Sequence, residues 1–549
     1  MSRRAADLLV DCLCAQGADR AFCVPGESYL SVLDALHQHP QIETLTCRHE
    51  SGAGFMAVAD AKLTGRAGVC FVSRGPGASN AAIAVHTAEQ DAVPLVLFIG
   101  QVPRHELGRG AFQEVDYGKT FADMAKGVWT VHDPDRLPEV VARAFAVASA
   151  PTPGPTVVVL PEDMLEEMTD AAVSAAMPQQ SAPFDPQAAA DIARRLAQSE
   201  KPLLIAGGAL DSPAGRAALH AAAQAHGLPV LTSFKRQDIF PNDDPLYAGH
   251  LGFKMPDAQR KVYEAADMLL AVGSRLGEVT SQGYRFPHAP QPVQPLIHVH
   301  PDPKHLNHVF AADTALACDP VSFLEALASQ PATRSPARKI WSDSLHARVA
   351  AARPWEAPAD GLLDMGPVVA ALCEQAGDDA IFITDAGNFS SWLHRHFPFN
   401  GRQRLLGAVG GAMGIGMPAA VAAGLRHPGR QVITLIGDGG FLMTGGELAT
   451  ALQYGVPVKI FISDNGSFGT IRMHQERQFP ERPAATDLQN PDFAKLAEAY
   501  GARGLTIERI EDAAAVVETA LQEAGPVVVH VRSALEHINA FTTLTQLRG

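Results

Sequence analysis

Short apolar runs, mostly of β-branched residues, alternate with alanine-rich segments of helical periodicity along the whole chain. The runs that predict strands lie at 68–73, 94–100, 156–161, 202–208, 267–274, 295–301, 379–387, 431–440, 457–465 and 526–533. Each run is continuously apolar and is followed by a helical pattern, which is typical of strands in parallel sheets covered on both faces. The pattern therefore predicts an α/β protein with doubly wound, mainly parallel sheets.

Two segments interrupt this pattern with a composition typical of linkers. The first, 169–186, is rich in Ala, Pro, Gln and Ser, and the second, 329–337, continues into Ala- and Pro-rich sequence near 350–360. Such composition shifts mark domain boundaries in exposed chain. They predict three doubly wound domains at 1–170, 187–328 and 355–549.

Composition narrows the classes of partner and compartment. The chain has 44 Lys and Arg against 59 Asp and Glu, a formal net charge of −15, which disfavours nucleic acid and anionic membranes. Its seven cysteines are dispersed and odd in number, as in a reducing compartment. The uncharged stretch 405–425 is long enough to cross a bilayer, but its six glycines and Pro418 favour a loop leading into a buried helix. We expect a cytoplasmic protein with no membrane partner.

The strongest chemical signal lies at 437–467. A predicted strand ends in glycines around Asp438, and a helix is expected to begin near Phe441. Backbone amides at such a turn can bind phosphate, since the helix N-terminus favours an anion. The next predicted strand ends at Asp464-Asn465, so two parallel strands deliver Asp438 and Asn465 to one sheet edge. These hard oxygen donors suit Mg²⁺ that also holds phosphate; the alternative is that both residues only form turns.

This spacing resembles the thiamine diphosphate motif, in which GDG is followed, after a spacer of this size, by a pair of asparagines. Asn465 stands 26 positions after the last glycine of GDG, whereas Asp464 replaces the first asparagine. The resemblance implies that Asp438, Asn465 and the backbone carbonyl of Ser467 bind Mg²⁺. Gly439 and Gly440 then lie at the diphosphate.

The segment 48–80 resembles the pyrimidine-binding domain of acetohydroxyacid synthases and related 2-oxo acid decarboxylases. Taken alone, Glu50 before an apolar helix could simply favour the helix dipole. The resemblance implies instead that Glu50 hydrogen-bonds the aminopyrimidine ring and shares a proton with it, which needs a carboxyl group in a dry site.

Further motifs extend the resemblance over essentially the whole chain. By these matches, Gly75 belongs to a glycine-proline-glycine turn, and Gln113 faces the reacting carbon from a loop. Gly411 and Met413 contact the pyrimidine, and the methionine side chain holds the cofactor in a bent conformation. The segment holding Gly387, Asn388 and Phe389, at another strand end, lies near the diphosphate.

The resemblance weakens on the substrate side. His474 stands where acetohydroxyacid synthases usually carry a tryptophan, and Ser28 and Tyr29 are more polar and bulkier than the usual residues. With Gln113, these three side chains are the candidates for substrate contact and proton relay. A histidine can act as acid or base near neutral pH, although a solvated loop histidine explains His474 equally well.

The central domain has a second possible ligand. Members of the family bind FAD or ADP there, or nothing, and Lys235 and Arg236 could meet a phosphate or solvate the surface. His298, His300, His305 and His308 also suggest a metal site, but no acidic or cysteine partner has suitable spacing, so strand and loop histidines are favoured.

The resemblance implies a thiamine diphosphate- and Mg²⁺-dependent enzyme that decarboxylates a 2-oxo acid and transfers the resulting enamine to an acceptor carbonyl, as acetolactate synthases do. The first alternative is a lyase, either a 2-oxo acid decarboxylase of the benzoylformate type or a 2-hydroxyacyl- or oxalyl-CoA lyase. The other enzymatic alternative is an FAD-linked 2-oxo acid oxidase. A cofactor-binding scaffold without turnover is disfavoured because Glu50 is present. In this family the cofactor lies across a dimer interface, so a homodimer or homotetramer is implied.

Overall fold

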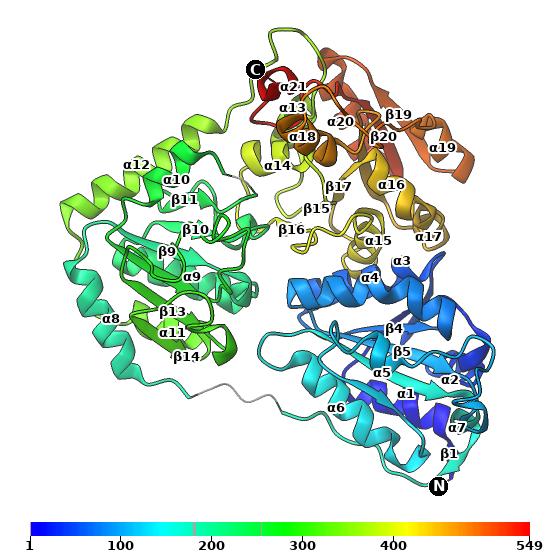
Figure 1. The fold of residues 1–549 in the computed structure, drawn as a ribbon. Helices are drawn as coiled ribbons and strands as arrows, with labels where there is room; N and C mark the ends of the chain where they lie inside the picture. Colours follow the sequence, from blue (N-terminus) through cyan, green and yellow to red (C-terminus); the bar gives the residue numbers. More distant parts are fainter. Residues whose placement is uncertain (1, 179–182, 254, 549) are drawn as a thin grey trace.

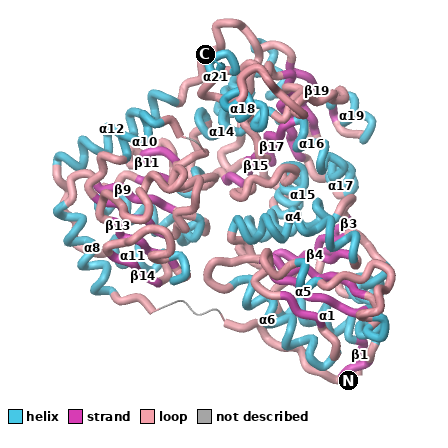
Figure 2. The backbone as a smooth tube through the Cα atoms, in the orientation of Figure 1, coloured by secondary structure: helices cyan, strands magenta, loops and turns pink. Residues whose placement is uncertain are grey.

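The computed structural model describes residues 2–178, 183–253 and 255–548. It contains three six-stranded sheets and a two-stranded pairing of β1 (Arg3–Arg4) with β8 (Met168–Thr169). Every strand pair within the three large sheets is parallel. The sheets follow one another along the chain and form three separate layered units in space (Figures 1 and 2). The α/β class with doubly wound parallel sheets is thereby confirmed.

The N-terminal sheet has the strand order β3-β2-β4-β5-β7-β6. Its two faces are covered by different helices: α1, α2 and α6 on one face, and α3 and α4 on the other. The strands are β2 (Arg20–Cys23), β3 (Glu43–Thr46), β4 (Gly68–Val72), β5 (Leu95–Gln101), β6 (Val128–Thr130) and β7 (Pro155–Pro161). The helices are α1 (Ala5–Ala15), α2 (Leu30–Gln38), α3 (Glu50–Thr64), α4 (Gly75–Asp91), α5 (Tyr117–Thr120), α6 (Leu137–Ser149) and α7 (Glu162–Glu166).

The central sheet has the order β11-β10-β9-β12-β13-β14, which is the strand order of a dinucleotide-binding fold. Its strands are β9 (Pro202–Ala206), β10 (Val230–Thr232), β11 (Tyr247–His250), β12 (Met268–Val272), β13 (Leu296–His300) and β14 (Thr314–Ala317). Its helices are α8 (Pro186–Gln198), α9 (Pro213–His226), α10 (Asp257–Tyr263), α11 (Pro320–Ala328) and α12 (Pro336–Ala352).

The C-terminal sheet, β16-β15-β17-β18-β20-β19, repeats the connectivity of the N-terminal sheet. Its strands are β15 (Ile381–Thr384), β16 (Arg404–Leu406), β17 (Val432–Gly437), β18 (Val458–Asp464), β19 (Arg503–Ile507) and β20 (Val527–Arg532). Its helices are α13 (Gly366–Gln375), α14 (Ser390–His396), α15 (Gly416–Arg426), α16 (Asp438–Thr444), α17 (Leu448–Gln453), α18 (Gly469–Gln478), α19 (Phe493–Tyr500), α20 (Ala513–Gln522) and α21 (Leu544–Arg548).

One continuous apolar core joins the N-terminal and C-terminal units. Helix α3 packs against both α4 and α15, so buried side chains of all three helices lie between the two sheets. In Figure 1 the blue α3–α4 layer faces the yellow α15, while the green central unit stands beside both. Small residues allow this close packing: a methyl group at Gly54 of α3 would lie 2.4 Å from the Cβ of Ala84 on α4.

All ten predicted strands are present, and the chain differs from the sequence prediction mainly in its helices. Helix α16 begins at Asp438 rather than near Phe441, so the glycine-rich turn is the first turn of the helix itself. The Ala- and Pro-rich sequence after 329–337 is mostly helix α12, with Ser335 as its N-cap and Trp341 buried against the central unit. The stretch 405–425 is a loop leading into α15. Within the described ranges no helix meets the length and hydropathy needed to cross a bilayer.

Candidate active site

The C-terminal sheet brings the predicted metal ligands to one edge. Gly437, at the end of β17, pairs with Ser463 on β18, so both strands end at the same level. Asp438, Asn465 and Ser467 follow these ends and line one cavity of about 1700 Å³. This is the position where parallel sheets bind ligands, next to the point where the strand order reverses between β15 and β17.

The donor set at this edge suits a hard cation. Asp438 is 4% exposed, and its Oδ1 accepts a 2.8 Å hydrogen bond from the Gly439 backbone N–H. Burial raises the pKa of Asp438 to about 6. Within the described ranges no group of three or more His, Cys, Asp or Glu is placed to hold a metal ion. The predicted ligands at this edge, the Asp438 carboxylate with the Asn465 amide oxygen and the Ser467 carbonyl, are a set that Mg²⁺ accepts when phosphate supplies the rest.

Gly387, Asn388 and Phe389 follow β15 and line the same cavity. The Phe389 ring fills the space beneath the loop, since a methyl group at Gly387 would lie 2.5 Å from it. Asn388 is fixed by a hydrogen bond of 3.1 Å from the Thr470 hydroxyl to its Oδ1. The same ring lies beside Gly437, where a methyl group would meet it at 3.1 Å, and both glycines line the cavity.

Gly411 and Met413 occupy the loop between β16 and α15 and also line the cavity. Gly411 has φ 74° and Gly414 has φ 88°, conformations that favour glycine. The loop is anchored by Asp385, whose carboxylate accepts hydrogen bonds from the N–H groups of Gly414 at 2.9 Å and Gly416 at 3.1 Å. Asp385 is the first residue of the segment predicted to lie near the diphosphate, but its role in holding this loop is not predicted from the sequence.

Removing this anchor is expected to loosen the cavity wall. In an Asp385→Ala variant the Gly414 and Gly416 N–H groups lose their acceptor, and burying unpaired donors costs about 1–3 kcal/mol each. We expect thiamine diphosphate, titrated by quenching of protein fluorescence, to bind at least about tenfold more weakly. Asp378→Ala, which removes an exposed carboxylate before the same strand, is the control and should leave the affinity unchanged.

The predicted residues of the N-terminal unit gather at the equivalent point of their own sheet. Glu50 opens α3, and its Oε2 accepts a 2.9 Å hydrogen bond from the Asn80 amide. Gln113 has φ 64°, and its carbonyl accepts a hydrogen bond from Gly75 N–H at 3.2 Å. The Ser28 hydroxyl accepts from the backbone N–H of Arg74, and the Arg74 side chain reaches Gln113. The Ser28 hydroxyl lies 3.2 Å from that of Ser73, and a methyl group at Gly77 would lie 3.3 Å from Glu50 and 3.4 Å from Ser73, so Ser28, Glu50, Gly75 and Gln113 form one cluster.

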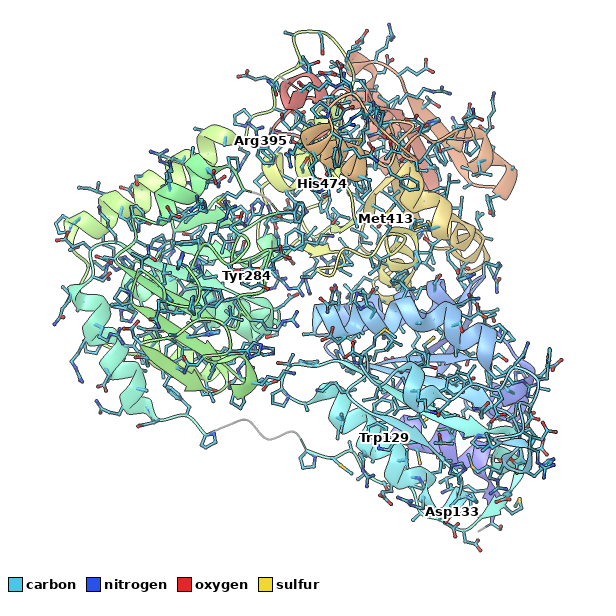
Figure 3. All side chains as sticks on the ribbon, in the orientation of Figure 1. Trp129, Asp133, Tyr284, Arg395, Met413 and His474 are labelled. Atoms are coloured by element: carbon cyan, nitrogen blue, oxygen red, sulfur yellow. The ribbon has the colours of Figure 1, made fainter. Side chains whose placement is uncertain are left out.

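Two predicted substrate contacts lie elsewhere. Tyr29 is 1% exposed, donates its hydroxyl hydrogen bond to the Val24 carbonyl and stacks on Phe71 at 5.9 Å. Its side chain is part of the core, because the apolar ring is covered by the sheet, and it does not line the cavity. His474 is half-buried on α18 and does not line the cavity, whereas its neighbour Met473 does. Figure 3 shows His474 and Met413 in the C-terminal unit.

The two clusters do not meet within one chain. The cavity reaches the C-terminal ends of α3 and α4 at Lys62 and Asp91, but Glu50 lies at the other end of α3. Twelve helical residues separate Glu50 from Lys62, which corresponds to about 18 Å along the axis. Glu50 is held there by its own chain, since Glu447 accepts hydrogen bonds from the N–H groups of Arg48 and His49.

The cavity also extends to the central sheet at its switch point between β9 and β12. Lys235, Arg236 and Arg275 line it there. Lys235 is 3% exposed and Arg236 is also buried, so the alternative that they solvate the surface is wrong. Nζ of Lys235 has no hydrogen-bond partner in the described part of the chain.

The histidines of β13 and the following loop pack among themselves and on backbone. The rings of His300 and His305 meet edge to face at 4.8 Å, and His298 Nε2 lies 2.8 Å from the Ser274 carbonyl. His300, His305 and His308 line the central part of the cavity.

The unpaired Lys235 is expected to reduce the stability of the ligand-free protein. Burial lowers its pKa from 10.5 to about 8, so at neutral pH the cost is about 3 kcal/mol, given about 1.4 kcal/mol per pKa unit. Because the unfolded chain binds this proton more tightly, stability should rise as pH increases from 8 to 10.5. We expect Lys235→Met to raise the thermal midpoint at pH 7, with the difference from wild type shrinking across that pH window. An equal or lower midpoint would contradict this.

Comparison with known proteins identifies the class that this fold and site define. Three family models match the chain: "Thiamine pyrophosphate enzyme, N-terminal TPP binding domain" at residues 3–120, the "central domain" at 189–327, and the "C-terminal TPP binding domain" at 385–531. The chain belongs to the thiamine pyrophosphate enzyme family.

Within this family the chain is similar to acetolactate synthase large subunits along nearly its whole length. It is 33% identical over 545 residues to the acetolactate synthase large subunit of Parasynechococcus marenigrum, covering 95% of this chain and 87% of the relative. It is 33% identical over 532 residues to the isozyme 2 large subunit of Escherichia coli, covering 96% and 95%. The large subunit IlvB1 of Mycobacterium tuberculosis is 32% identical over 522 residues, covering 92% and 84%. The protein is thus a thiamine pyrophosphate-dependent enzyme of the acetolactate synthase-like group.

Proposed function

We propose that this enzyme decarboxylates a 2-oxo acid and joins the remaining acyl unit to an acceptor carbonyl, as an acetolactate synthase does. The observation that carries the proposal is the cavity at the C-terminal switch point, where Asp438, Asn465, Ser467, Gly411 and Met413 share one wall. The whole-length similarity to acetolactate synthase large subunits supports the same reaction class.

In this proposal the C-terminal unit holds thiamine diphosphate and Mg²⁺. Asp438, Asn465 and the Ser467 carbonyl would bind the metal, and the backbone at Gly387, Gly439 and Gly440, with Asn388 and Phe389 beside it, would face the diphosphate. Gly411 and Met413 would hold the pyrimidine. When bound, the cofactor supplies a carbanion that adds to the keto carbon and accepts the electrons released with carbon dioxide.

The N-terminal cluster would supply the proton chemistry. Glu50, kept in place by Asn80 and by its helix, would hold a proton at its carboxyl group for exchange with a ring nitrogen. Gln113 and Ser28 would face the substrate, because they lie on the loops around Gly75 in the same cluster. His474 remains a candidate for contacts from α18.

Because Glu50 does not line the cavity that holds Asp438, and lies at the end of α3 opposite to Lys62 where the cavity touches that helix, a second copy of the chain would be needed to bring the two residues together. We infer a homodimer in which each active site uses the N-terminal cluster of one subunit and the C-terminal cavity of its partner. Exposed apolar side chains near both clusters support such an interface: Phe112, Ile83, Leu442, Met443 and Ile471.

The central part of the cavity would take a nucleotide, either FAD or ADP. It lies at the switch point of a sheet with the dinucleotide-binding strand order, and Arg236 and Arg275 offer positive charge to phosphates. The same charges favour a second candidate function, a lyase acting on a 2-hydroxyacyl- or oxalyl-CoA thioester, since a coenzyme A substrate also needs cationic partners. An FAD-linked oxidase is a third candidate; a yellow purified protein would show bound FAD, and oxygen consumption with a 2-oxo acid would then distinguish the oxidase from an FAD-binding carboligase.

Product analysis by NMR tests these alternatives directly. The enzyme, supplied with thiamine diphosphate and Mg²⁺, is given pyruvate, glyoxylate, benzoylformate or branched 2-oxo acids while carbon dioxide release is followed. Acetolactate formed from pyruvate would support the carboligase. Free aldehyde would favour the decarboxylase, and no turnover of any 2-oxo acid would favour the thioester lyase.

A further inference from the structure

Asp464 is the position where the chain departs from the paired asparagines of the cofactor motif. It ends β18, directly before the proposed metal ligand Asn465. Its carboxylate accepts three hydrogen bonds within the described chain: Asn490 Nδ2 at 2.7 Å, Gly466 N at 3.1 Å and His530 Nε2 at 2.7 Å. A carboxylate that only formed a turn would need the Gly466 contact alone.

His530 reaches Asp464 because of the strand register. His530 on β20 pairs with Ile462 on β18, and Asp464 lies two residues further along the same face. Diagonal neighbours on adjacent strands are within reach of long side chains. The imidazole is 1% exposed and packs edge to face on Phe493 at 5.2 Å, so its orientation toward Asp464 is fixed by the core.

Asn490 connects this pair to the cation site. Its Nδ2 donates to Asp464 Oδ1 at 2.7 Å and to Asp438 Oδ2 at 2.8 Å. Because ionised carboxylates only accept hydrogen bonds, the amide nitrogen must be the atom that faces both of them. One oxygen of Asp438 is therefore held by Asn490 and the other by the Gly439 backbone.

From this geometry we infer that His530, Asp464 and Asn490 are positioning residues that orient the Asp438 carboxylate for the metal, and that His530 makes an aspartate acceptable at position 464. The inference rests on the metal site proposed above. The carboxylates of Asp438 and Asp464 both contact the Asn490 amide, and in a buried site two such close negative charges would repel each other. Asn490 donates a hydrogen bond to each carboxylate, and His530 donates a further one to Asp464. Residues that orient metal ligands in this way typically contribute 10- to 100-fold to metal affinity.

The test measures Mg²⁺ affinity by isothermal titration calorimetry on the intact protein at constant thiamine diphosphate. Asn490→Ala is expected to weaken Mg²⁺ binding about 10- to 100-fold, since Asp438 loses a donor. His530→Leu should weaken it to a smaller extent. His530→Gln, whose amide can still donate to Asp464, should stay close to wild type. Asn400→Ala, an asparagine that forms a turn before β16, is the matched control.

The decisive variant combines Asn490→Ala with His530→Leu. If His530 acts through Asn490, the second substitution should change the Mg²⁺ affinity no further, although it can lower the thermal midpoint. Additive losses of Mg²⁺ affinity in the double variant would overturn the inference that His530 acts on Asp438 through Asp464 and Asn490. Wild-type Mg²⁺ affinity in Asn490→Ala would overturn it as well. If wild-type protein binds no Mg²⁺, the proposed metal site is wrong and the inference about Asn490 and His530 fails with it. If wild-type protein binds Mg²⁺ but the variants do not change the affinity as stated, only the inference about Asn490 and His530 fails.

Discussion

Glu50→Gln is expected to lower kcat about 10²- to 10⁴-fold, the usual contribution of one positioned proton-transfer group. The glutamine keeps the size and the hydrogen bond to Asn80 but cannot exchange a proton with a ring nitrogen. Binding of Mg²⁺ and thiamine diphosphate should change little, because the proposed ligands of the metal and the diphosphate lie in the cavity around Asp438 and glutamine can still hydrogen-bond the ring. Steady-state rates with the substrate found by product analysis, together with titration of both ligands, measure the two effects.

Glu43→Gln is the control for this substitution, since that exposed carboxylate on β3 pairs with the Arg20 side chain and does not line the cavity. It should retain wild-type turnover. Unchanged turnover in Glu50→Gln itself would remove Glu50 from the proton path, and equal losses of turnover and metal affinity would indicate a structural role.

Mixed dimers of two inactive variants are expected to recover activity. Glu50→Gln lacks only the N-terminal group and Asp438→Ala lacks only the metal ligand. If each site combines clusters from two subunits, a heterodimer has one intact site and one site with both defects. With random pairing, half of the dimers are mixed, so co-expression should restore about a quarter of the wild-type sites. The rate per total protein, measured on co-expressed subunits, gives this fraction.

A second mixture distinguishes shared sites from sites within one chain. Co-expressing wild type with the double variant Glu50→Gln/Asp438→Ala should leave about a quarter of the sites active if sites are shared, because every site of a mixed dimer then has one defect. Sites contained within one chain would instead give about half. No recovery in the first mixture and half activity in the second would overturn the shared site.

Sequence alone determined the architecture and most of the C-terminal site. Continuous apolar runs bounded by glycines define buried parallel strands, and all ten predicted runs form strands of the three large sheets. Parallel strands end at a common edge, so the residues that follow them could be expected to converge. Asp438, Asn465 and Ser467 do so, as do Gly387 and Gly411. The convergence of these residues follows from the local strand pattern together with the rule that parallel strands end at a common edge of the sheet.

Composition was a weaker guide to the connections. The segment 329–337, continuing loosely through 350–360, is predicted to be a linker because it is rich in Ala and Pro, yet Ser335 caps helix α12 and Pro336 starts it. An Ala- and Pro-rich composition does not exclude a helix, because Pro is favourable in a first helical turn and Ala is favourable throughout a helix. Burial of Trp341 and Leu345 against the central unit then fixes its place.

Contacts between residues distant in sequence were decided only by the tertiary structure. Asp385 anchors a loop about thirty residues away, and Asn490 and His530 reach Asp464 from other elements. Strand order and register bring these groups together, and no local pattern encodes either. The depth of a side chain is also a tertiary property, which is why Tyr29 and Lys235 are buried although their neighbours in sequence suggested exposed loops. Whether Glu50 lines the cavity around Asp438 likewise depends on how α3 packs on α15, a contact between two units that sequence periodicity cannot specify.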